Sequence, residues 1–387
     1  MPFSKSPNVA QYQNADWDNH VKTVSGTTVE AARRIAVMDP QITFFFYCRQ
    51  AVALGQQGTF QAGDAVFFSG QSWPGEAPQC DVYTKEQLTV GYISSNDTDG
   101  DMLPASCFTL EQGGPAFDIV LYFATNLQYV SPQTHTLYGC NPAVQPCPDT
   151  PWYTQPNTQM QKALTASWNS NVVQQLQDQG SVVLMSVLGN WTDAGWSNFT
   201  TWEDAQAFAQ SLNTNYIKGY GFDGIDIDDE YSAGTPNSTS LAMVTLAIRQ
   251  AMPDKLLTIA AYSGSPLEQP QCWRTQYAPP NSDAPKRTAA QNIDYVWDMS
   301  YGTSVDASTY EGYGFSKNRI FWGVQGGYNS GSSVATQVQQ ESLGGVMFFT
   351  IDKTATQTQA GDAINTLFGA GSWQVTPGCL PDSWKQT

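Results

Sequence analysis

Residues 221–230 combine five carboxylates with three apolar side chains in one short stretch, Gly-Phe-Asp-Gly-Ile-Asp-Ile-Asp-Asp-Glu. The apolar residues alternate with the acids, which predicts an extended strand whose side chains point alternately to its two faces. Asp226, Asp228 and Glu230 then share one face. Carboxylates crowded together in a buried strand cannot all ionise freely, so at least one should have a raised pKa. The stretch therefore predicts a catalytic proton donor.

Two other interpretations of this stretch remain open. Alternating aspartates also ligate calcium, but a calcium loop needs Gly at its sixth position and a bidentate Glu at its twelfth, and neither offset fits. The acids could also form a purely structural strand end. Elsewhere, His20 and His135 lack the partner spacing of a metal site, and no Gly-rich phosphate loop precedes a helix. We therefore predict neither a metal nor a cofactor.

The composition restricts the choice of partner. The chain has 387 residues and a formal net charge of -17, with only 13% charged residues and 17 scattered Lys and Arg. Nucleic acids and anionic membranes are bound mainly through basic side chains, so neither is an expected partner. No apolar run is long enough to cross a membrane. We expect a soluble protein whose substrate is neutral.

The seven cysteines leave the redox state open. Cys140 and Cys147 form the best local pair, because they lie close in sequence around two prolines. The alternative is that all seven thiols are free and buried. If the protein is exported, its signal peptide is not part of this sequence.

The first 85 residues differ in pattern from the rest. A helix is expected over Thr28–Val37, followed by an apolar strand over Ile42–Cys48 and a second strand over Asp64–Ser69. We interpret residues 1–85 as a small β-rich module of unknown role. Its three consecutive aromatics, residues 44–46, could form a sugar platform, but adjacent strand residues face opposite sides, which favours burial.

From Gln87 onward, apolar runs that suit strands alternate with amphipathic stretches that suit helices. This alternation is typical of βα units around a parallel sheet. Eight strands are expected, at Leu88–Ser94, Phe117–Ala124, Ser181–Leu188, Phe222–Asp228, Leu256–Ala261, Ile293–Ser300, Arg319–Val324 and Gly345–Ile351. Residues 86–387 therefore predict an α/β fold, a (β/α)8 TIM barrel, in which catalytic groups lie at the C-terminal strand ends. The acidic stretch is the fourth strand, and Glu230 lies at its end.

The connections between these strands differ in length. Helices are expected at Asn169–Gln179, Trp202–Lys218, Ser238–Ala251 and Ser333–Glu341. Residues 125–168 and 262–290 are longer connections, and both follow a strand's C-terminal end. We expect both to be loops that line the active-site end of the barrel.

Four segments resemble one known family. The run 223–230 fits the Asp-Gly-x-Asp-x-Asp-x-Glu signature of glycoside hydrolase family 18 at every fixed position. Ser186-Val-Leu-Gly-Asn190 resembles the family's Ser-x-Gly-Gly segment, with Asn190 in place of the second glycine. Met299-Ser-Tyr301 resembles the Met-x-Tyr-Asp segment, with Gly302 in place of the Asp. In the eighth-strand segment, residues 345–349, a Phe stands where chitinases keep a Trp.

Other segments point to one branch of that family. The acidic run continuing to Tyr231, together with Ala251-Met-Pro-Asp-Lys255 and Ala116-Phe-Asp118, looks more like endoglycosidase H and its relatives than like chitinases. The resemblance covers about residues 87–370 and does not reach the N-terminal module. It implies an endo-β-N-acetylglucosaminidase that cleaves between the two core GlcNAc residues of protein N-glycans. The partners would be glycoproteins or their glycans, and the enzyme would be secreted or extracellular.

The resemblance also implies roles for individual residues. In this family the substrate's own 2-acetamido oxygen attacks the anomeric carbon, giving an oxazolinium intermediate. Glu230 would protonate the leaving oxygen and later activate water. Asp228 would orient the acetamido N–H, and Asp226 would lie beneath it and share a proton with it. Tyr301 would hold the acetamido oxygen.

Substrate-binding candidates are less specific. Trp152, Trp191 and Trp196 lie in loops after the second and third strands, where exposed rings could stack on sugars, and Asn190 lies beside them. Packing in the core or anchoring of these loops is the alternative role for the tryptophans.

Two other functions compete with this hypothesis. A chitinase is the first, although processive chitinases carry a folded insertion before the last strand, where this chain has only residues 325–344. A catalytically inactive sugar-binding protein is the second, although such relatives normally lose the acid at the position of Glu230. The accepted glycan class, the role of the module and the oligomeric state are not legible from the sequence.

Overall fold

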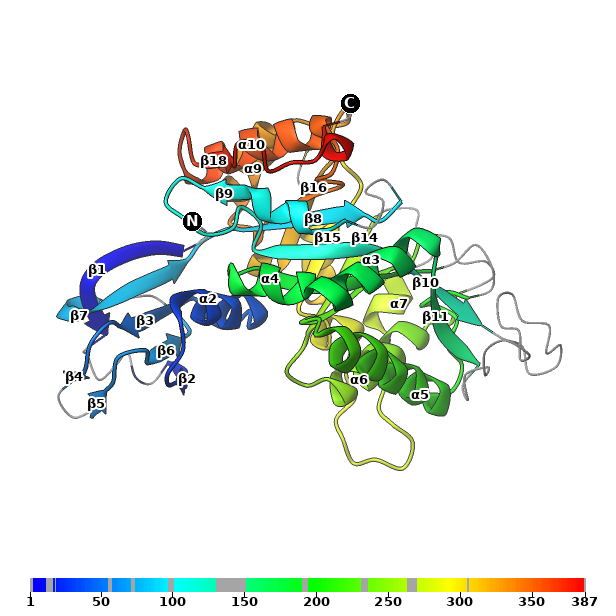
Figure 1. Ribbon diagram of the computed structural model, residues 1–387. Coiled ribbons are helices and arrows are strands. Elements are labelled where there is room, and N and C mark those ends of the chain that lie inside the picture. The colour runs from blue at the N-terminus through cyan, green and yellow to red at the C-terminus, as the bar shows by residue number, and fades with distance from the viewer. Residues whose placement is uncertain are drawn as a thin grey trace.

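The computed structural model describes residues 3–11, 17, 19–54, 58–70, 74–96, 101–129, 151–189, 194–230, 236–262, 270–304 and 306–385. Figure 1 shows an N-terminal sheet, in blue, beside a larger barrel with helices around it. None of the helices in these residues is long and apolar enough to cross a membrane.

The N-terminal part is a five-stranded antiparallel sheet with one helix. Its strand order is β1-β7-β3-β6-β2, formed by β1 (Phe3–Gln11), β7 (Pro74–Lys85), β3 (Phe44–Cys48), β6 (Ala65–Phe68) and β2 (His20–Val24). Helix α2 (Val29–Met38) begins after Thr28, whose side chain accepts a hydrogen bond from Ala31 N–H. A small hairpin joins β4 (Val52–Ala53) to β5 (Thr59–Phe60). The expected strands and helix of this region are therefore present.

Both faces of this sheet are covered. Phe45 packs in the cluster that includes α2 and the barrel, whereas Phe44 and Phe46 pack on the opposite face with Phe60 and Phe68. Residues 44–46 are at most 1% exposed. The burial expected for these aromatics is confirmed, and they do not form a sugar platform.

Eight parallel strands close into a barrel. In chain order they are β8 (Leu88–Ser94), β10 (Ile119–Tyr129), β12 (Val182–Leu188), β13 (Gly224–Asp228), β14 (Leu256–Ala261), β15 (Tyr295–Asp298), β16 (Ile320–Val324) and β17 (Gly345–Phe348). Each pairs with the next, and β8 pairs with both β17 and β10, which closes the sheet. The predicted TIM barrel and all eight predicted strands are confirmed, with ends that shift by a few residues.

Helices surround the barrel. They are α3 (Thr158–Ser170), α4 (Val172–Asp178), α5 (Trp202–Leu212), α6 (Ser240–Ala251), α7 (Pro270–Arg274), α8 (Ser308–Tyr313), α9 (Gly331–Glu341) and α10 (Thr354–Phe368), with a π-helical segment η3 (Asn213–Lys218) and short 3-10 turns η5 (Ala289–Gln291), η6 (Lys317–Arg319) and η7 (Asp382–Trp384). The helix expected over Asn169–Gln179 is present as α4, and the additional helix α3 comes directly before it. Asn171 separates them, because its left-handed φ of 51° breaks the helical path.

The connection over residues 125–168 differs from the expected loop. Strand β10 runs on to Tyr129 and pairs antiparallel with β11 (Trp152–Pro156), and α3 follows at once. The expectation of a long irregular loop is therefore wrong for the described part of this connection. Cys140 and Cys147, the local pair expected from the sequence, lie outside the described residues.

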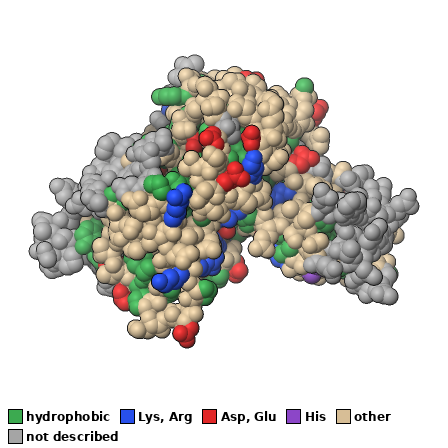
Figure 2. Space-filling model, turned by 180° about the vertical axis from the view of Figure 1, so that it is seen from behind, with side chains coloured by type: hydrophobic (Ala, Val, Ile, Leu, Met, Phe, Trp, Pro, Cys, Tyr) green, Lys and Arg blue, Asp and Glu red, His purple; other side chains and the backbone are tan. Residues whose placement is uncertain are grey.

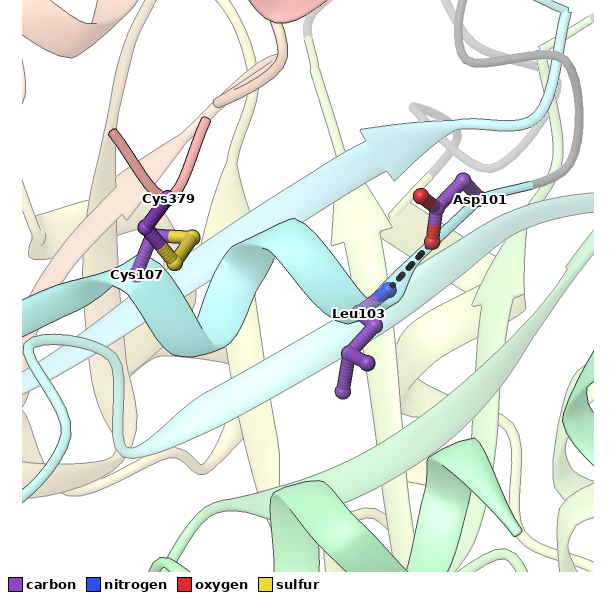
Figure 3. The surroundings of a disulfide bond; sticks show 4 residues. All are labelled: Asp101, Leu103, Cys107 and Cys379. Atoms are coloured by element: carbon purple, nitrogen blue, oxygen red, sulfur yellow. Dashed lines mark hydrogen bonds between the residues drawn. A yellow bond between two sulfur atoms is a disulfide. The ribbon is translucent and has the colours of Figure 1, made fainter. Parts of the chain in front are cut away.

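One disulfide joins distant parts of the chain. Cys107 bonds to Cys379 across a sequence separation of 272 residues. Figure 3 shows this bond beside the turn η2 (Leu103–Cys107), where Leu103 N–H donates to Asp101 Oδ1. Strand β18 (Trp373–Val375) also pairs with β9 (Phe108–Leu110), so the bond and a small sheet together hold the C-terminal segment against the barrel.

The module packs against the end of the barrel where strands begin. Arg34 of α2 forms an ion pair of 2.7 Å with Asp223, the residue before β13. Buried Lys85 donates to the α2 carbonyls of Ala36 (2.8 Å) and Asp39 (3.3 Å), and burial lowers its pKa to about 8. Because catalytic groups of such barrels lie at the other end, the module supports the floor of the barrel.

Candidate active site

Strand β13 positions the carboxylates in the barrel. Ile225 and Ile227 pack outward in the large core shared with the helices, so Asp226 and Asp228 point into the barrel. Gly224 begins the strand because a Cβ there would lie 2.0 Å from Leu256 O on the neighbouring strand. The close approach of two backbones thus explains the glycine in the motif.

Asp226 is completely buried and receives four hydrogen bonds. The donors come from four different strands: Tyr92 Oη (2.7 Å) and Ser186 Oγ (2.9 Å) to Oδ2, and Thr258 Oγ1 (2.6 Å) and Trp297 Nε1 (2.9 Å) to Oδ1. Burial raises the pKa of Asp226, and these hydrogen bonds oppose that rise. Four donors occupy the acceptor sites of an ionised carboxylate and leave no oxygen free for a proton. We infer that Asp226 is the fixed anion beneath the site.

Asp228 lies in the opposite electrostatic situation. It is 2% exposed, and burial, followed by the charges of Glu230, Asp226 and Asp229, raises its pKa well above the usual range. A hydrogen bond with Glu230 raises the pKa further. Of the two aspartates that point into the barrel, Asp228 is therefore the one whose surroundings more strongly favour the protonated form. Within the described residues, Asp228 Oδ1 is buried without a hydrogen-bond partner.

Glu230 follows β13 by two positions and is partly exposed. Its hydrogen bond with Asp228 connects that buried carboxyl to an acid that solvent or substrate can reach. The three acids thus form a row from a buried carboxylate with four hydrogen-bond donors, through a buried carboxyl whose pKa is raised, to an accessible acid. Such a row can deliver a proton and can stabilise developing positive charge.

Tyr301 follows β15 in an uncommon backbone conformation. Its φ is 52°, the left-handed region that few side chains other than Asn, Asp and Gly adopt. Strain of this kind is often found at functional sites. Its half-buried ring lies 6.4 Å from that of Phe349, which in turn lies 5.7 Å from Tyr92, the donor to Asp226. Tyr301 therefore belongs to the same layer of side chains as the carboxylates.

The tryptophan candidates are placed differently. Trp196 has no exposed surface, and its indole N–H donates to Val187 O at 2.9 Å. Trp152 is 3% exposed and stacks on Phe199 with ring centroids 4.0 Å apart. A buried ring cannot stack on a sugar, so these contacts correct the stacking role and support loop anchoring. Asn190 and Trp191 lie outside the described residues.

Two neighbours of the catalytic acids have structural contacts. Asp223 accepts hydrogen bonds from Gln177 Nε2 (2.9 Å) and Val183 N–H (3.0 Å) in addition to its ion pair. Asp229 accepts the Trp196 backbone N–H at 3.2 Å and so holds the loop after β12. These contacts give both residues a structural role.

The four donors to Asp226 were not predicted as site residues. Ser186 and Thr258 pair with Asp226 in register on the two neighbouring strands. A polar residue at the inward position of an otherwise apolar strand was a signal for them. No comparable signal marks Tyr92 or Trp297, because aromatic residues are ordinary in a core.

Other features lie away from these acids. In the described part of the chain, no group of three or more His, Cys, Asp and Glu residues could hold a metal ion. A cavity of about 520 Å³ lies between α2 and the residues that precede β14, β15 and β16, among them Lys255, Asp294 and Arg319. Figure 2 shows a hollow with Lys and Arg side chains at its edges between the two parts of the molecule. This cavity is at the floor of the barrel and is not the candidate active site.

The fold and the acids together define a class. An eight-stranded TIM barrel with an Asp-x-Asp-x-Glu row on its fourth strand is the arrangement of a family 18 glycoside hydrolase. The model of the endo-β-N-acetylglucosaminidase EndoS TIM-barrel domain matches residues 152–320.

Individual proteins agree with this class. Endo-β-N-acetylglucosaminidase F1 of Elizabethkingia meningoseptica is 30% identical over 269 residues, covering 66% of this chain and 69% of that protein. An endo-β-N-acetylglucosaminidase of Flavobacterium sp. (strain SK1022) is 27% identical over 260 residues, covering 66% and 70%. The crystal structure of EndoBT-3987 from Bacteroides thetaiotamicron with a Man5GlcNAc product shares the fold, with a TM-score of 0.54, 18% identity and coverage of 97% and 92%.

The chain therefore belongs to the endo-β-N-acetylglucosaminidases of glycoside hydrolase family 18. It is a glycoside hydrolase with endo-β-N-acetylglucosaminidase activity.

Proposed function

We propose that this enzyme hydrolyses the β-1,4 bond between the two core GlcNAc residues of protein N-glycans. The observation that carries the proposal is the Asp226–Asp228–Glu230 row, with one carboxylate that accepts four hydrogen bonds, one buried carboxyl whose pKa is raised and one accessible acid. A similar fold has been crystallised with a Man9GlcNAc2Asn substrate, in EndoBT-3987.

The reaction uses the substrate's acetamido group as nucleophile. Its oxygen attacks C1, the glycosidic C1–O bond breaks, and the Glu230 proton passes to the leaving oxygen. Water then attacks C1 of the oxazolinium intermediate, gives its proton to Glu230 and regenerates the acetamide. The configuration at C1 is retained because two displacements occur in sequence.

The neighbouring residues orient that nucleophile. Buried Asp228 Oδ1 lacks a partner within the described residues and would accept the acetamido N–H. The charge of Asp226 would stabilise the positive charge that develops on the sugar ring. Tyr301 would donate its hydroxyl to the acetamido oxygen and hold it in line with C1.

The connection between β16 and β17 supports an open site. Between Val324 and Gly345 the structure has a turn and the helix α9, with no inserted domain. An open cleft suits a bulky glycoprotein better than a long polymer chain that must be threaded.

Digestion of high-mannose, hybrid and complex glycoproteins, with mass analysis of both products, tests the proposal. We expect one GlcNAc to remain on the protein and the released glycan to end in the other. Early NMR spectra should show the β-anomer of the product. Release of sugars from soluble chitin oligomers, with the glycoproteins unchanged, would favour the chitinase alternative instead.

We also propose that the enzyme is secreted. The Cys107–Cys379 bond supports this, because disulfides persist mainly in oxidising compartments. Fractionation of the producing cells and their medium tests it, and retention in the reduced cytosol with both thiols free would contradict it.

A further inference from the structure

Tyr328 is an exposed aromatic ring at the active-site end of the barrel. Its side chain is 69% exposed, whereas Tyr129 and Val375, the other exposed large hydrophobic residues in the described part of the chain, are both 38% exposed. Tyr328 lies four residues after β16, so it is at the end of the barrel that carries the acids. A large apolar ring left in water at such a position is a common feature of a binding site.

Hydrogen bonds hold the turn that carries this ring. Tyr328 N–H donates to Gln325 O at 3.1 Å, and Asn329 Oδ1 accepts the Gln325 N–H at 3.1 Å. Asn329 Nδ2 donates to Gly323 O (2.9 Å) and to Gly302 O (3.2 Å). Gly302 directly follows Tyr301, so the turn is tied to the segment that carries the acetamido-binding candidate. The ring of Tyr328 is therefore presented by an ordered backbone.

The ring extends a row that begins at the buried anion. Tyr92 donates to Asp226, Phe349 contacts Tyr92, and Tyr301 lies next to Phe349. The ring centroids of Tyr301 and Tyr328 are 6.2 Å apart, with an interplanar angle of 47°. A sugar whose acetamido group contacts Tyr301 would thus have Tyr328 beside it on the seventh-strand side.

We propose that Tyr328 forms a substrate subsite and stacks on a pyranose ring of the N-glycan next to the GlcNAc held at Tyr301. The inference rests on the proposed function. The apolar face of a pyranose suits an aromatic ring, and a ring held by its backbone loses little conformational freedom on binding. The proposed role of Tyr328 is in substrate binding and not in the chemical step.

Binding and turnover are measured separately to test this subsite. In the Glu230→Gln background, Tyr328→Ala should weaken the binding of a Man9GlcNAc2 glycopeptide roughly tenfold in Kd, the size of effect expected when one aromatic contact is lost. In the otherwise unchanged enzyme, the same substitution should raise KM by a similar factor with kcat within about twofold. Tyr328→Phe, which keeps the ring, should retain nearly full binding. Val375→Ala is the control for an exposed apolar residue remote from the site.

Each outcome decides one question. Equal Kd values with and without the Tyr328 ring would overturn the subsite, as would a Tyr328→Phe variant as weak as Tyr328→Ala. Tight glycopeptide binding by the Glu230→Gln protein, with no cleavage by the unsubstituted enzyme, would reject the proposed function and leave the subsite measurable. Absence of both binding and cleavage would reject both.

An independent observation concerns two cysteines of the N-terminal sheet. Cys48 ends β3, Cys80 lies in β7, and the two residues are direct partners in the antiparallel register. Neither has exposed surface, and their sulfur atoms are 2.9 Å apart. Two sulfur atoms that are not bonded repel each other at such a separation.

The backbone geometry at this pair suits a covalent bond. Arg49 N–H donates to Gln79 O and Lys85 N–H donates to Thr43 O, both at 2.7 Å, which marks these as hydrogen-bonded pairs. Since the two kinds of pair alternate, the two cysteines form a non-hydrogen-bonded pair, whose Cα atoms lie about 4.5 Å apart. Disulfides span Cα separations of about 4.4–6.8 Å.

We infer that Cys48 and Cys80 form a second disulfide in the mature protein. The oxidant is a low-molecular-weight disulfide such as oxidised glutathione. Each cysteine gives up its thiol hydrogen, the Sγ–Sγ bond forms, and the oxidant's S–S bond is reduced to two thiols. The bond joins the strands on either side of a long segment and stiffens the sheet that supports the floor of the barrel.

Peptide mapping of the unreduced enzyme tests this bond directly. Trypsin should produce residues 35–49 and 50–85, each with one cysteine, because no Lys or Arg lies inside either peptide. For protein isolated under oxidising conditions, we expect one linked mass, two hydrogens below the sum of the two peptides, which separates on reduction. Two alkylated, unlinked peptides from such protein would overturn the inference.

Thermal unfolding gives a second measurement. The double substitution Cys48→Ser with Cys80→Ser should lower Tm by roughly 5–10 °C, because the unfolded chain regains the freedom of the intervening loop. Buried Cys272, which is unbonded in the structure, provides the control, since Cys272→Ser should not change the response of Tm to a reducing agent. An unchanged Tm on reduction of the bond between residues 48 and 80 would contradict the stiffening role.

Discussion

Strand β13 has an aspartate at each end, and the two ends have opposite surroundings. At the floor, Asp223 is paired with Arg34 and accepts two further hydrogen bonds. At the active-site end, the charges of Glu230, Asp226 and Asp229 raise the pKa of Asp228 in addition to burial, which is the larger cause. The compensated aspartate stabilises the fold, whereas burial and like charges favour the protonated form of the uncompensated one. The two aspartates behave differently because their neighbours differ.

The largest expected effect follows from the replacement of the catalytic acid candidate, Glu230. Glu230→Gln keeps the shape of the side chain but cannot give or take a proton, so we expect glycan release to slow by roughly 10³-fold or more. The rate of release from a high-mannose glycoprotein, followed by mass analysis, measures this loss. Glu341→Gln, at an exposed helix position, is the control. A rate that Glu230→Gln leaves unaltered would reject the assigned role.

Replacement of Asp228, at the active-site end of β13, should change how the stability of the enzyme depends on pH. The pKa of Asp228 is raised on folding, so between the ordinary carboxyl range and the raised pKa the folded state binds more protons than the unfolded state, and stability falls as pH rises. Asp228→Asn removes this pH dependence. Its Tm, relative to the unsubstituted enzyme, should therefore increase as the pH rises above about 4, the ordinary carboxyl range.

The same variant should lose activity. Without the carboxyl group that orients the acetamido group, we expect glycan release to fall roughly 100-fold. Differential scanning calorimetry over the pH series and a rate assay at one pH give the two readouts. Parallel Tm curves for the two proteins would mean that Asp228 does not hold a proton in the folded state.

A substitution at the Asp223 end of β13, at the floor of the barrel, should lower the stability of the enzyme and leave its catalytic rate unchanged. Arg34→Met leaves Asp223 buried without its cation, so we expect the free energy of unfolding to fall by about 3 kcal/mol. The kcat per folded molecule should not change. Urea unfolding measures the first quantity and active-site titration the second. Lys317→Met, at the exposed pair with Glu341, is the matched control and should have no measurable effect on stability.

The smallest expected effect concerns the donors to Asp226. Thr258→Val removes one of four hydrogen bonds and so raises the pKa of Asp226 further. Because Asp226 acts as an anion, the acid limb of the pH–rate profile should move to higher pH, with kcat roughly tenfold lower. Thr245→Val is the control, because its buried hydroxyl donates to Leu241 O and accepts from Asn292 Nδ2. Neither of these residues is among the four donors to Asp226. An unshifted acid limb would show that Asp226 does not need this donor.

Much of the barrel could be predicted because its signals are local. Strands such as β8 and β14 were located to the residue by their apolar runs, and the helices by their amphipathic periods. The inward side of β13 was also predictable, since a period of two assigns Asp226 and Asp228 to one face. These patterns depend only on neighbours a few positions away along the chain.

Other features could not be predicted because they join distant segments. The partner of Cys107 is 272 residues away, and seven cysteines allow many pairings. Strand β10 extends to Tyr129 and pairs antiparallel with β11. The mixed composition of residues 125–168 gives no clear strand pattern, so this pairing was not predicted. For Trp196, the sequence left both an exposed sugar-stacking role and a buried role open. The structure shows a buried ring, because several elements that are distant in sequence pack around it.

The sequence by itself determined the catalytic row, its strand and the barrel that carries it, because alternating acids and apolar residues allow only one arrangement in a buried parallel strand. The tertiary structure decided how the surroundings of the two buried aspartates differ, and with them the sizes of their pKa shifts. Asp226 and Asp228 occupy equivalent positions in the pattern, but only folding brings the donors Tyr92, Thr258 and Trp297 to the first and leaves the second among like charges. Protonation depends on the charges and donors around a group, and those come from segments that are far apart in the chain.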